Sequence, residues 1–241
     1  MEEIAIIFGA ASGIGKSSYE LLKKQYKNLR FILVDKEEIN LLDDCDISYK
    51  LDFSDMDKVN LFIKNILTKY DKIKFLINSV GYQDELNVLS LDQESWDQMY
   101  NTTVKSIFFL EREIIEIMLK NRIVNQSIVN VTSIHTEIIR DIPHYSSSKA
   151  SLKMLSKELA YKFATDGIRV NCVEPGSIDT PLLRKSLKNQ NQIDSAAQNI
   201  PLLRHGHSGE VAKLIAFLVS DDALYITGES VVIDGGLSLV I

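Results

Sequence analysis

Cysteine is scarce in this chain, and Cys45 and Cys172 are its two examples among 241 residues. Two cysteines are too few for a disulfide framework, and their spacing does not suit a metal site. Long apolar runs are also missing, because no stretch approaches the ~18 apolar residues that a membrane span requires. The start, Met1-Glu2-Glu3, lacks the basic residues of a signal peptide, so we expect a cytoplasmic location and no association with membranes.

Positive charge is in deficit, since 27 lysines and arginines face 33 acidic residues and leave a formal net charge of -6. This balance predicts no general attraction to nucleic acid or anionic lipid. Hydrophobic residues make up 45% and charged residues 25%, which is typical of a globular chain rather than a disordered one. Neither an internal repeat nor a flexible linker divides the sequence, so residues 1–241 are predicted to form a single domain.

Short apolar runs rich in β-branched residues alternate with helical patterns along the chain. Several runs are apolar throughout, as strands covered on both faces should be. The alternation predicts an α/β fold of Rossmann type, a doubly wound parallel sheet of seven strands with helices on both faces. The predicted strands span residues 4–8, 31–34, 48–51, 75–77, 127–131, 169–173 and 230–233, and the predicted helices span 14–24, 56–70, 92–119, 146–164 and 210–220.

Two segments break this rhythm. Residues 35–47 are charged and weakly periodic, so a helix there is short or absent. Residues 182–200 follow Pro181 and contain a polar tract at 188–193. A long connection at this point of an α/β sheet favours a substrate lid, and a mobile surface loop without a role is the alternative.

A glycine-rich loop follows the first predicted strand and opens the first predicted helix, with Gly9, Gly13 and Gly15 in it. Glycines here permit a tight turn and let the backbone approach a pyrophosphate, which rests on the helix N-terminus. Asp35 ends the second strand, 20 residues after Gly15, where an acidic group would meet the adenosine ribose. This arrangement predicts a dinucleotide site.

Asp35 also indicates which dinucleotide binds. A carboxylate accepts hydrogen bonds from the ribose hydroxyls of NAD, but it repels the 2′-phosphate of NADP. At ~4 Å and an effective dielectric near ~20, each unit of like charge costs on the order of 4 kcal/mol. Lys36 would soften this repulsion, but no arginine stands beside it or in the glycine loop. NAD is therefore the expected cofactor, and NADP is less favoured.

Tyr145 and Lys149 are predicted to lie one helical turn apart on one helix face. Ionising a tyrosine near neutrality requires ~4 kcal/mol, and an adjacent cation supplies part of it, which gives a general acid/base for a carbonyl–alcohol pair. The same spacing occurs twice elsewhere, on amphipathic helices where a structural role is expected. Only this pair follows a strand that leads to Ser133, and strand carboxyl ends are where doubly wound sheets bind ligands.

From residue 4 to residue 238, these motifs resemble the short-chain dehydrogenase/reductase superfamily, in its compact single-domain branch. The glycine loop looks like the family's TGxxxGIG with Phe8 in place of threonine, residues 78–81 stand at its Asn-Asn-Ala-Gly, and residues 175–180 resemble its PGxIxT element. Residues 234–236 resemble its closing DGG. The resemblance implies that the cofactor contacts are Gly9, Ser12, Gly13, Ile14, Gly15, Asp35, Asp52, Phe53, Asn78, Gly81, Tyr145, Lys149, Pro175, Gly176, Ile178 and Thr180.

The resemblance also implies hydride transfer between a substrate carbon and nicotinamide C4, with three catalytic residues. Tyr145 would exchange a proton with the substrate oxygen, Ser133 would hydrogen-bond that oxygen, and Lys149 would hold the ribose and lower the pKa of the tyrosine. Thr103 stands where the family has an asparagine that helps to hold a water in a proton relay. Threonine serves if the main-chain carbonyl holds this water, whereas proton exchange is slower if the side chain does.

The histidines suggest a substrate pocket more than a metal site. His205 and His207 lie in a predicted connecting loop without a third ligand at suitable spacing, so we expect no metal. His135 and His144 flank Ser133 and Tyr145, and each either lines the pocket or lies at the surface. The other expected lining residues are Tyr82, Gln83, Glu137, Ser177, Leu183 and Leu187, a mixture that favours a small polar hydroxy or keto substrate.

The favoured function is an NAD-dependent alcohol dehydrogenase or ketone reductase that acts on a small metabolite. A reductase of 3-oxoacyl groups on acyl carrier protein is one alternative, and it needs a basic rim for which Arg122 and Arg169 are candidates. A dinucleotide-sensing protein that has lost turnover is the other, suggested only by Thr103. The resemblance and the apolar C-terminal end also imply a homotetramer.

Overall fold

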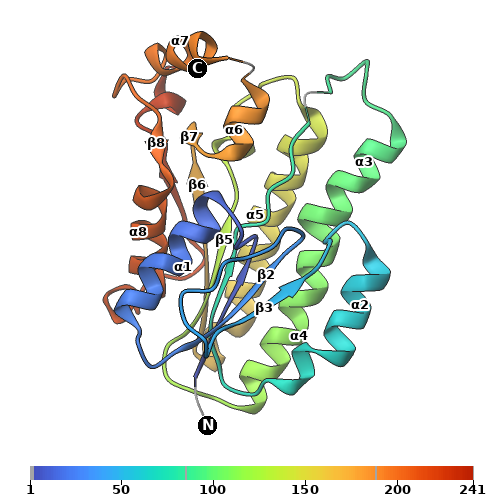
Figure 1. Ribbon diagram of the computed structural model, residues 1–241, viewed down its shortest axis with the longest axis vertical. Helices are drawn as coiled ribbons and strands as arrows, with labels where there is room; N and C mark the ends of the chain where they lie inside the picture. The colour runs from blue at the N-terminus through green and yellow to red at the C-terminus, as the bar shows by residue number, and fades with distance from the viewer. Residues whose placement is uncertain (1–2, 85, 188, 241) are drawn as a thin grey trace.

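The computed structural model describes residues 3–84, 86–187 and 189–240. Seven strands form one parallel sheet (Figure 1), and each predicted strand agrees with an observed one to within two residues at either end. The fold-class prediction is therefore confirmed. The strands of this sheet are β1 (Ile4–Phe8), β2 (Arg30–Asp35), β3 (Ile47–Lys50), β4 (Ile73–Asn78), β5 (Gln126–Val131), β6 (Ile168–Pro175) and β9 (Ser230–Ile233).

The strand order places a crevice in the middle of the sheet. The order is β3-β2-β1-β4-β5-β6-β9, so the chain runs outward from β1, returns to the centre, and continues outward from β4 in the other direction. Doubly wound sheets bind ligands outside the carboxyl ends of the strands at such a reversal. In Figure 1 this edge faces the top, where α6 (Pro181–Ser186) and α7 (Gln190–Gln198) lie, and the N-terminus lies at the bottom.

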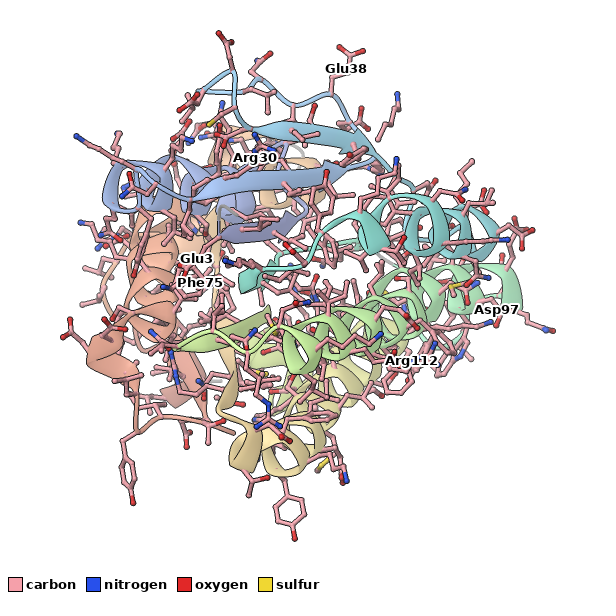
Figure 2. The ribbon with its side chains drawn as sticks, turned by 90° about the horizontal axis from the view of Figure 1, so that it is seen from below. Glu3, Arg30, Glu38, Phe75, Asp97 and Arg112 are labelled. Atoms are coloured by element: carbon pink, nitrogen blue, oxygen red, sulfur yellow. The ribbon has the colours of Figure 1, made fainter. Side chains whose placement is uncertain are left out.

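Helices cover both faces of the sheet. One layer consists of α1 (Gly13–Gln25) and α8 (Ser208–Val219), and the other consists of α2 (Met56–Asn65), α4 (Ser106–Lys120) and α5 (Pro143–Phe163). Figure 2 views the molecule from below and shows these layers on either side of the strands, with Glu3 near their amino ends. Within the described ranges, none of the helices combines the length and the apolar character needed to cross a membrane.

Several helices differ from their predicted bounds. The helix predicted over residues 92–119 has three parts: α3 (Gln93–Tyr100), a π-helical turn (Asn101–Lys105) and α4. α5 begins at Pro143 instead of residue 146, because proline lacks an N–H and fits the first turn of a helix. α2 ends five residues before the predicted end at 70, and residues 67–69 form a separate 3₁₀ turn. Residues 35–47 contain no helix, as expected.

The segment after β6 contains structure that the sequence did not indicate. The predicted lid, residues 182–200, folds mainly into α6 and α7, and the part of its polar tract at Lys188 lies outside the described residues. Two short parallel strands, β7 (Ile178–Asp179) and β8 (Gly206–His207), pair with each other beside the main sheet. The prediction of a plain connecting loop around His207 is therefore wrong. Strands of two residues are too short to show a periodic pattern.

A carboxyl group is buried between α4 and the sheet. Glu111 is 1% exposed, and neither of its carboxyl oxygens has a hydrogen-bond partner among the described residues. Burial raises its pKa to about 7, and the nearby amide of Asn130 offsets part of this rise. In the unfolded chain this carboxyl has its ordinary pKa near ~4.3. The folded protein therefore holds the proton more tightly, and its stability falls as pH rises between these two values.

We expect Glu111→Gln to abolish this part of the pH dependence, because the amide keeps the size of the side chain and does not ionise. The stability of the variant relative to wild type should rise by about 3 kcal/mol between pH 4 and pH 8. Urea unfolding at both values measures this difference, with Glu116→Gln, an exposed change on the same helix, as the control. An equal difference in unfolding free energy between the variant and wild type at both pH values would show that Glu111 does not ionise in this range.

Candidate active site

One cavity of about 760 Å³ runs along the carboxyl ends of β1 to β6. Its walls come from the loops that follow these strands and from α6 and α7. Pockets for cofactors and small molecules have volumes of ~300–1,000 Å³, so this cavity is large enough for such a ligand. The cavity lies at the reversal in strand order, at the carboxyl edge of the sheet, and this edge faces the top of Figure 1.

The glycine loop forms one wall of the cavity. Gly9 has a φ of +75° and Gly13 a φ of +54°, which is the left-handed region that favours glycine. A Cβ on Gly9 would lie 2.5 Å from the carbonyl oxygen of Ser79, so the loop can pack against β4 only without a side chain there. Gly15 does not line the cavity; a Cβ on it would collide with the Gly9 carbonyl oxygen. Gly9, Ser12, Gly13 and Ile14 all line the cavity.

The end of the cavity beside β2 and β3 is acidic. Asp35, Glu37 and Asp52 line it together with Phe53. The carboxylate of Asp35 accepts hydrogen bonds from the main-chain N–H of Ala11 at 2.9 Å and from that of Glu37 at 3.0 Å, which fixes it against the glycine loop. Glu37 is a third carboxylate, which no motif in the sequence indicated. A ligand at this end therefore meets three acidic groups and the cation of Lys36, which also lines the cavity.

Asn78 lies beneath the cavity and not on its surface. Its side chain is 1% exposed and donates from Nδ2 to Oδ1 of Asn130 at 2.8 Å. Its own Oδ1 accepts from the main-chain N–H of Val80 at 3.2 Å, which holds the turn that carries Gly81 into the cavity wall. Asn130 in turn donates to Ser156 of α5 at 2.9 Å. Asn78 thus positions the loop after β4 through a buried polar chain.

The three predicted catalytic residues meet at the middle of the cavity. Ser133 follows β5, Tyr145 lies in the first turn of α5, and Lys149 lies one turn further along the same helix. The Lys149 ammonium group is buried and donates to the main-chain carbonyl of Val131 at 2.9 Å and to that of Val80 at 3.3 Å. The lysine therefore joins the ends of β4 and β5 below the tyrosine.

Burial is the largest influence on the pKa values of Tyr145 and Lys149. It raises the pKa of the Tyr145 phenol, although a hydrogen bond with Ser133 and the positive charge of Arg140 lower the pKa in part. Burial also lowers the pKa of Lys149 to about 8. At neutral pH the tyrosine is a neutral phenol, which can donate a proton, beside a lysine that is still mostly cationic.

The opposite wall follows β6. The residues that line the cavity here are Pro175, Gly176, Ser177, Ile178 and Thr180. The Ser177 hydroxyl lies 2.9 Å from Nδ1 of His205, and Nε2 of His205 lies 2.8 Å from the carbonyl oxygen of Ile193 in α7. A carbonyl only accepts, so Nε2 carries the proton and Nδ1 accepts from the serine. His205 therefore connects the cavity wall to α7. Among the described residues, no three histidine, cysteine or acidic side chains form a cluster that could hold a metal ion.

A contact that the sequence did not indicate, between His144 and Asp84, lies beside Tyr145. His144 is fully buried, and its Nε2 is 2.6 Å from Oδ1 of Asp84, whose other oxygen accepts from the Tyr82 hydroxyl at 3.1 Å. Asp84 belongs to the loop after β4, so this pair fastens that loop to the start of α5. The two residues are 60 apart in the chain, and no local pattern relates them.

Most of the predicted pocket residues face the cavity. Glu137 does not line it, because its carboxylate is exposed and pairs with Lys153 at 2.8 Å. His144 lies behind the wall rather than in it. The residues that do line it are Tyr82, Gln83, His135, Ser177, Leu183 and Leu187, together with Arg140, Gln98, Leu182 and Val240, which the sequence analysis did not identify.

Thr103 lies in the π-helical turn between α3 and α4. It is 1% exposed, and its hydroxyl lies 3.7 Å from the sulfur of Met99, one turn earlier. Its neighbour Thr102 lines the cavity, whereas Thr103 does not. Short π-helical turns within helices occur frequently at functional sites. The side chain of Thr103 is thus used for packing within its own helix.

Comparison with known proteins agrees with this architecture. A family model described as enoyl-(acyl carrier protein) reductase matches residues 9–238. A 3-oxoacyl-[acyl-carrier-protein] reductase, FabG of Thermotoga maritima, is 33% identical over 98% of this chain and 97% of its own length. Dehydrogenase/reductase SDR family member 6 of Aquarana catesbeiana is 30% identical, with 98% of each chain covered. The structure of a 4-hydroxyisoleucine dehydrogenase complexed with NADH is 29% identical, with a TM-score of 0.89 over 98% of this chain and 99% of that chain.

Proposed function

Because the chain belongs to the short-chain dehydrogenase/reductase superfamily, we propose that it interconverts a small hydroxy compound and its ketone with NAD. The observation that carries this proposal is the shared cavity, in which Ser133, Tyr145 and Lys149 lie between the glycine loop and the wall after β6. Bound NAD(H) would supply the hydride acceptor or donor.

The cavity walls fit such a cofactor. The N-terminus of α1 opens directly from the glycine loop, where free main-chain N–H groups favour a pyrophosphate. Asp35 would accept hydrogen bonds from the adenosine ribose, and Asp52 and Phe53 would border the adenine. Pro175, Gly176, Ile178 and Thr180 would hold the nicotinamide end, while Asn78 and Gly15 would support the binding loops from behind.

Proton transfer at the substrate oxygen is assigned to Tyr145. In the direction of reduction its phenol donates a proton to the forming alkoxide, and in oxidation its phenolate takes the proton back. Ser133 orients the substrate oxygen by a hydrogen bond. The Lys149 ammonium group has three donors, and two of them are used by the carbonyls of Val80 and Val131. The third would hold the ribose hydroxyls, and the group supplies positive charge beneath the tyrosine.

We propose that α6 and α7 act as a substrate lid. Leu182, Leu183 and Leu187 face the cavity from this segment, as do Ala196 and Asn199. Lids of this kind exclude water from the reaction and commit the substrate. The hydrogen bonds of His205 to Ser177 and Ile193 would hold the lid in its closed position.

A homotetramer in a cytoplasmic location also belongs to this proposal, with no partner other than a small-molecule substrate. Apolar side chains at the surface support association, among them Phe217 at 42% and Leu239 at 85% exposed. Burial of such side chains against another copy removes apolar area from water. A monomer at micromolar concentration in light scattering would exclude this assembly.

Reduction of 3-oxoacyl groups on acyl carrier protein is the second candidate, and the similarity to FabG favours it. The predicted basic rim does not support it. Arg169 lies at the amino end of β6, away from the cavity, and is 6% exposed. It donates to Asn125 and to the main-chain carbonyls of Ser220 and Ile226. Arg122 is paired with Asp166 at 2.8 Å.

We expect at least a tenfold preference for NAD over NADP in kcat/KM. Asp35 and Glu37 both line the end of the cavity where the adenosine ribose would bind, and Lys36 interacts electrostatically with Asp52, whose pKa it helps to lower. Burial, which raises the pKa of Asp52, and the hydrogen bonds from Ser54, which lower it, are both larger effects than that of Lys36. Asp35→Ala should narrow the preference, with Asp57→Ala as a control elsewhere on the surface. Equal efficiency with both cofactors in wild type would contradict this assignment.

Tyr145→Phe should remove nearly all turnover while the affinity for NAD stays within a few-fold. The change deletes the transferable proton and keeps the ring packed against His135, so the loss should appear in kcat. Cofactor reduction with a panel of alcohols, sugars and hydroxy acids measures activity, and fluorescence titration measures affinity. Strong residual activity would assign the proton to another group, and an inactive wild type that binds NAD would favour the sensing protein.

Thr103→Asn should change kcat by less than about threefold, or under ~0.7 kcal/mol in the barrier. The Thr103 hydroxyl is directed to Met99 and not to the cavity, so a relay through this position would use its main chain. Thr103→Val, which keeps the shape and removes the hydroxyl, is the matched control. A tenfold rise with asparagine, accompanied by a smaller solvent isotope effect, would show that the side chain takes part.

A further inference from the structure

The charges that line the cavity are divided between its two ends. The described carboxylates of the lining, Asp35, Glu37 and Asp52, all lie beside β2 and β3. At the end near Ser133 and Tyr145, the described lining residues include no carboxylate, but they include Arg140. Lys36 also lines the acidic end, so that end carries three carboxylates and one cation. An anion is therefore repelled from this end of the cavity and attracted to the other.

Arg140 differs from the other arginines in lacking a partner. It makes no hydrogen bond or ion pair with any residue in the described part of the chain. The other six are engaged: Arg112 with Glu113, Arg122 with Asp166, Arg169 with Asn125, Arg184 with Asp179 and Arg204 with Glu210, and Arg30 also has a partner. Arg140 is exposed and lines both the cavity and a shallower hollow beside it, so its unpaired guanidinium is free to donate to a ligand there.

The second cation near this end is not free to bind an anion. Lys149 is 2% exposed, and its ammonium group already donates to the carbonyls of Val80 and Val131. His135 does not add charge, because burial lowers its pKa and the charge of Arg140 lowers it further. Arg140 is therefore the charged group that a substrate would meet here, and its effect on Tyr145 places it within electrostatic range of the reacting oxygen.

We infer that the substrate is a small hydroxy or keto carboxylic acid whose carboxylate pairs with Arg140. The planar guanidinium matches a carboxylate with two parallel hydrogen bonds. A single free cation suits a monoanion, whereas a phosphate dianion would need a second one. The aliphatic part of the substrate, between its carboxylate and its reacting carbon, would be enclosed by Leu183, Leu187 and Ile138. This inference rests on the proposed oxidoreductase function and adds the class of substrate.

Matched pairs of substrates test the inference on the enzyme with bound NADH. Short 2-, 3- and 4-keto acids would be compared with their methyl esters, and acetoacetate with its neutral N-acetylcysteamine thioester. We expect wild type to prefer the acids by at least tenfold in kcat/KM. Arg140→Gln should raise KM for the acids at least tenfold with kcat within threefold, and should leave KM for the esters within twofold. Arg140→Lys should recover part of the loss, and Arg122→Gln is the control.

The possible outcomes separate this inference from the proposed function. Equal or better turnover of the esters, the thioester or a phosphorylated ketone, unaffected by Arg140→Gln, would overturn the inference and leave the oxidoreductase standing. Absence of turnover with every compound would contradict the proposed function instead. In that case binding of butanoate, compared with butanamide by ligand-observed NMR, decides the inference: binding of butanoate that Arg140→Gln weakens supports it, and equal binding of both compounds rejects it.

Discussion

The buried ammonium group of Lys149 holds together the two strand ends on which the site is built. Its hydrogen bonds to the carbonyls of Val131 and Val80 join the end of β5 to the loop after β4. A buried cation is costly unless its donors are satisfied, so this contact fixes the distance between the two loops. Tyr145 lies one turn earlier in α5, so the contact of Lys149 with the two loops also holds Tyr145 beside Ser133. Removal of the lysine would therefore disturb the geometry of the site as well as its charge.

Two further contacts fix the positions of the other loops along the cavity. The main-chain N–H of Ala11 donates to Asp35, which couples the glycine loop to the end of β2. On the other side, the contact between Asp84 and His144 couples the loop after β4 to the first turn of α5. Each joins segments that are far apart in the chain but adjacent at the carboxyl edge of the sheet. The acidic end and the end that carries Arg140 are consequently held in a fixed relation to Tyr145.

Much of this arrangement follows from local patterns in the sequence. The seven strands appear as apolar runs because a parallel strand is covered on both faces, and the glycine loop is evident from its position between a strand and a helix. Spacing alone did not distinguish Tyr145 from two other tyrosine–lysine pairs, but its position after β5 did. The contact between Asp84 and His144 could not be predicted, because it depends on where two distant loops meet. Arg169 was expected in a basic rim for a related reason, because nothing in the sequence indicates that a charged residue at the start of a strand is buried.

The protonation of Tyr145 links these features to the direction of the proposed reaction. Burial raises the pKa of the phenol, and Ser133 and Arg140 offset only part of that increase. The tyrosine is therefore protonated at neutral pH, which is the form that donates a proton during reduction of a carbonyl. Oxidation of an alcohol requires the phenolate, so it needs a higher pH or additional positive charge near the ring. Because pairing with a carboxylate would neutralise Arg140, a bound keto acid would keep the tyrosine in its proton-donating form.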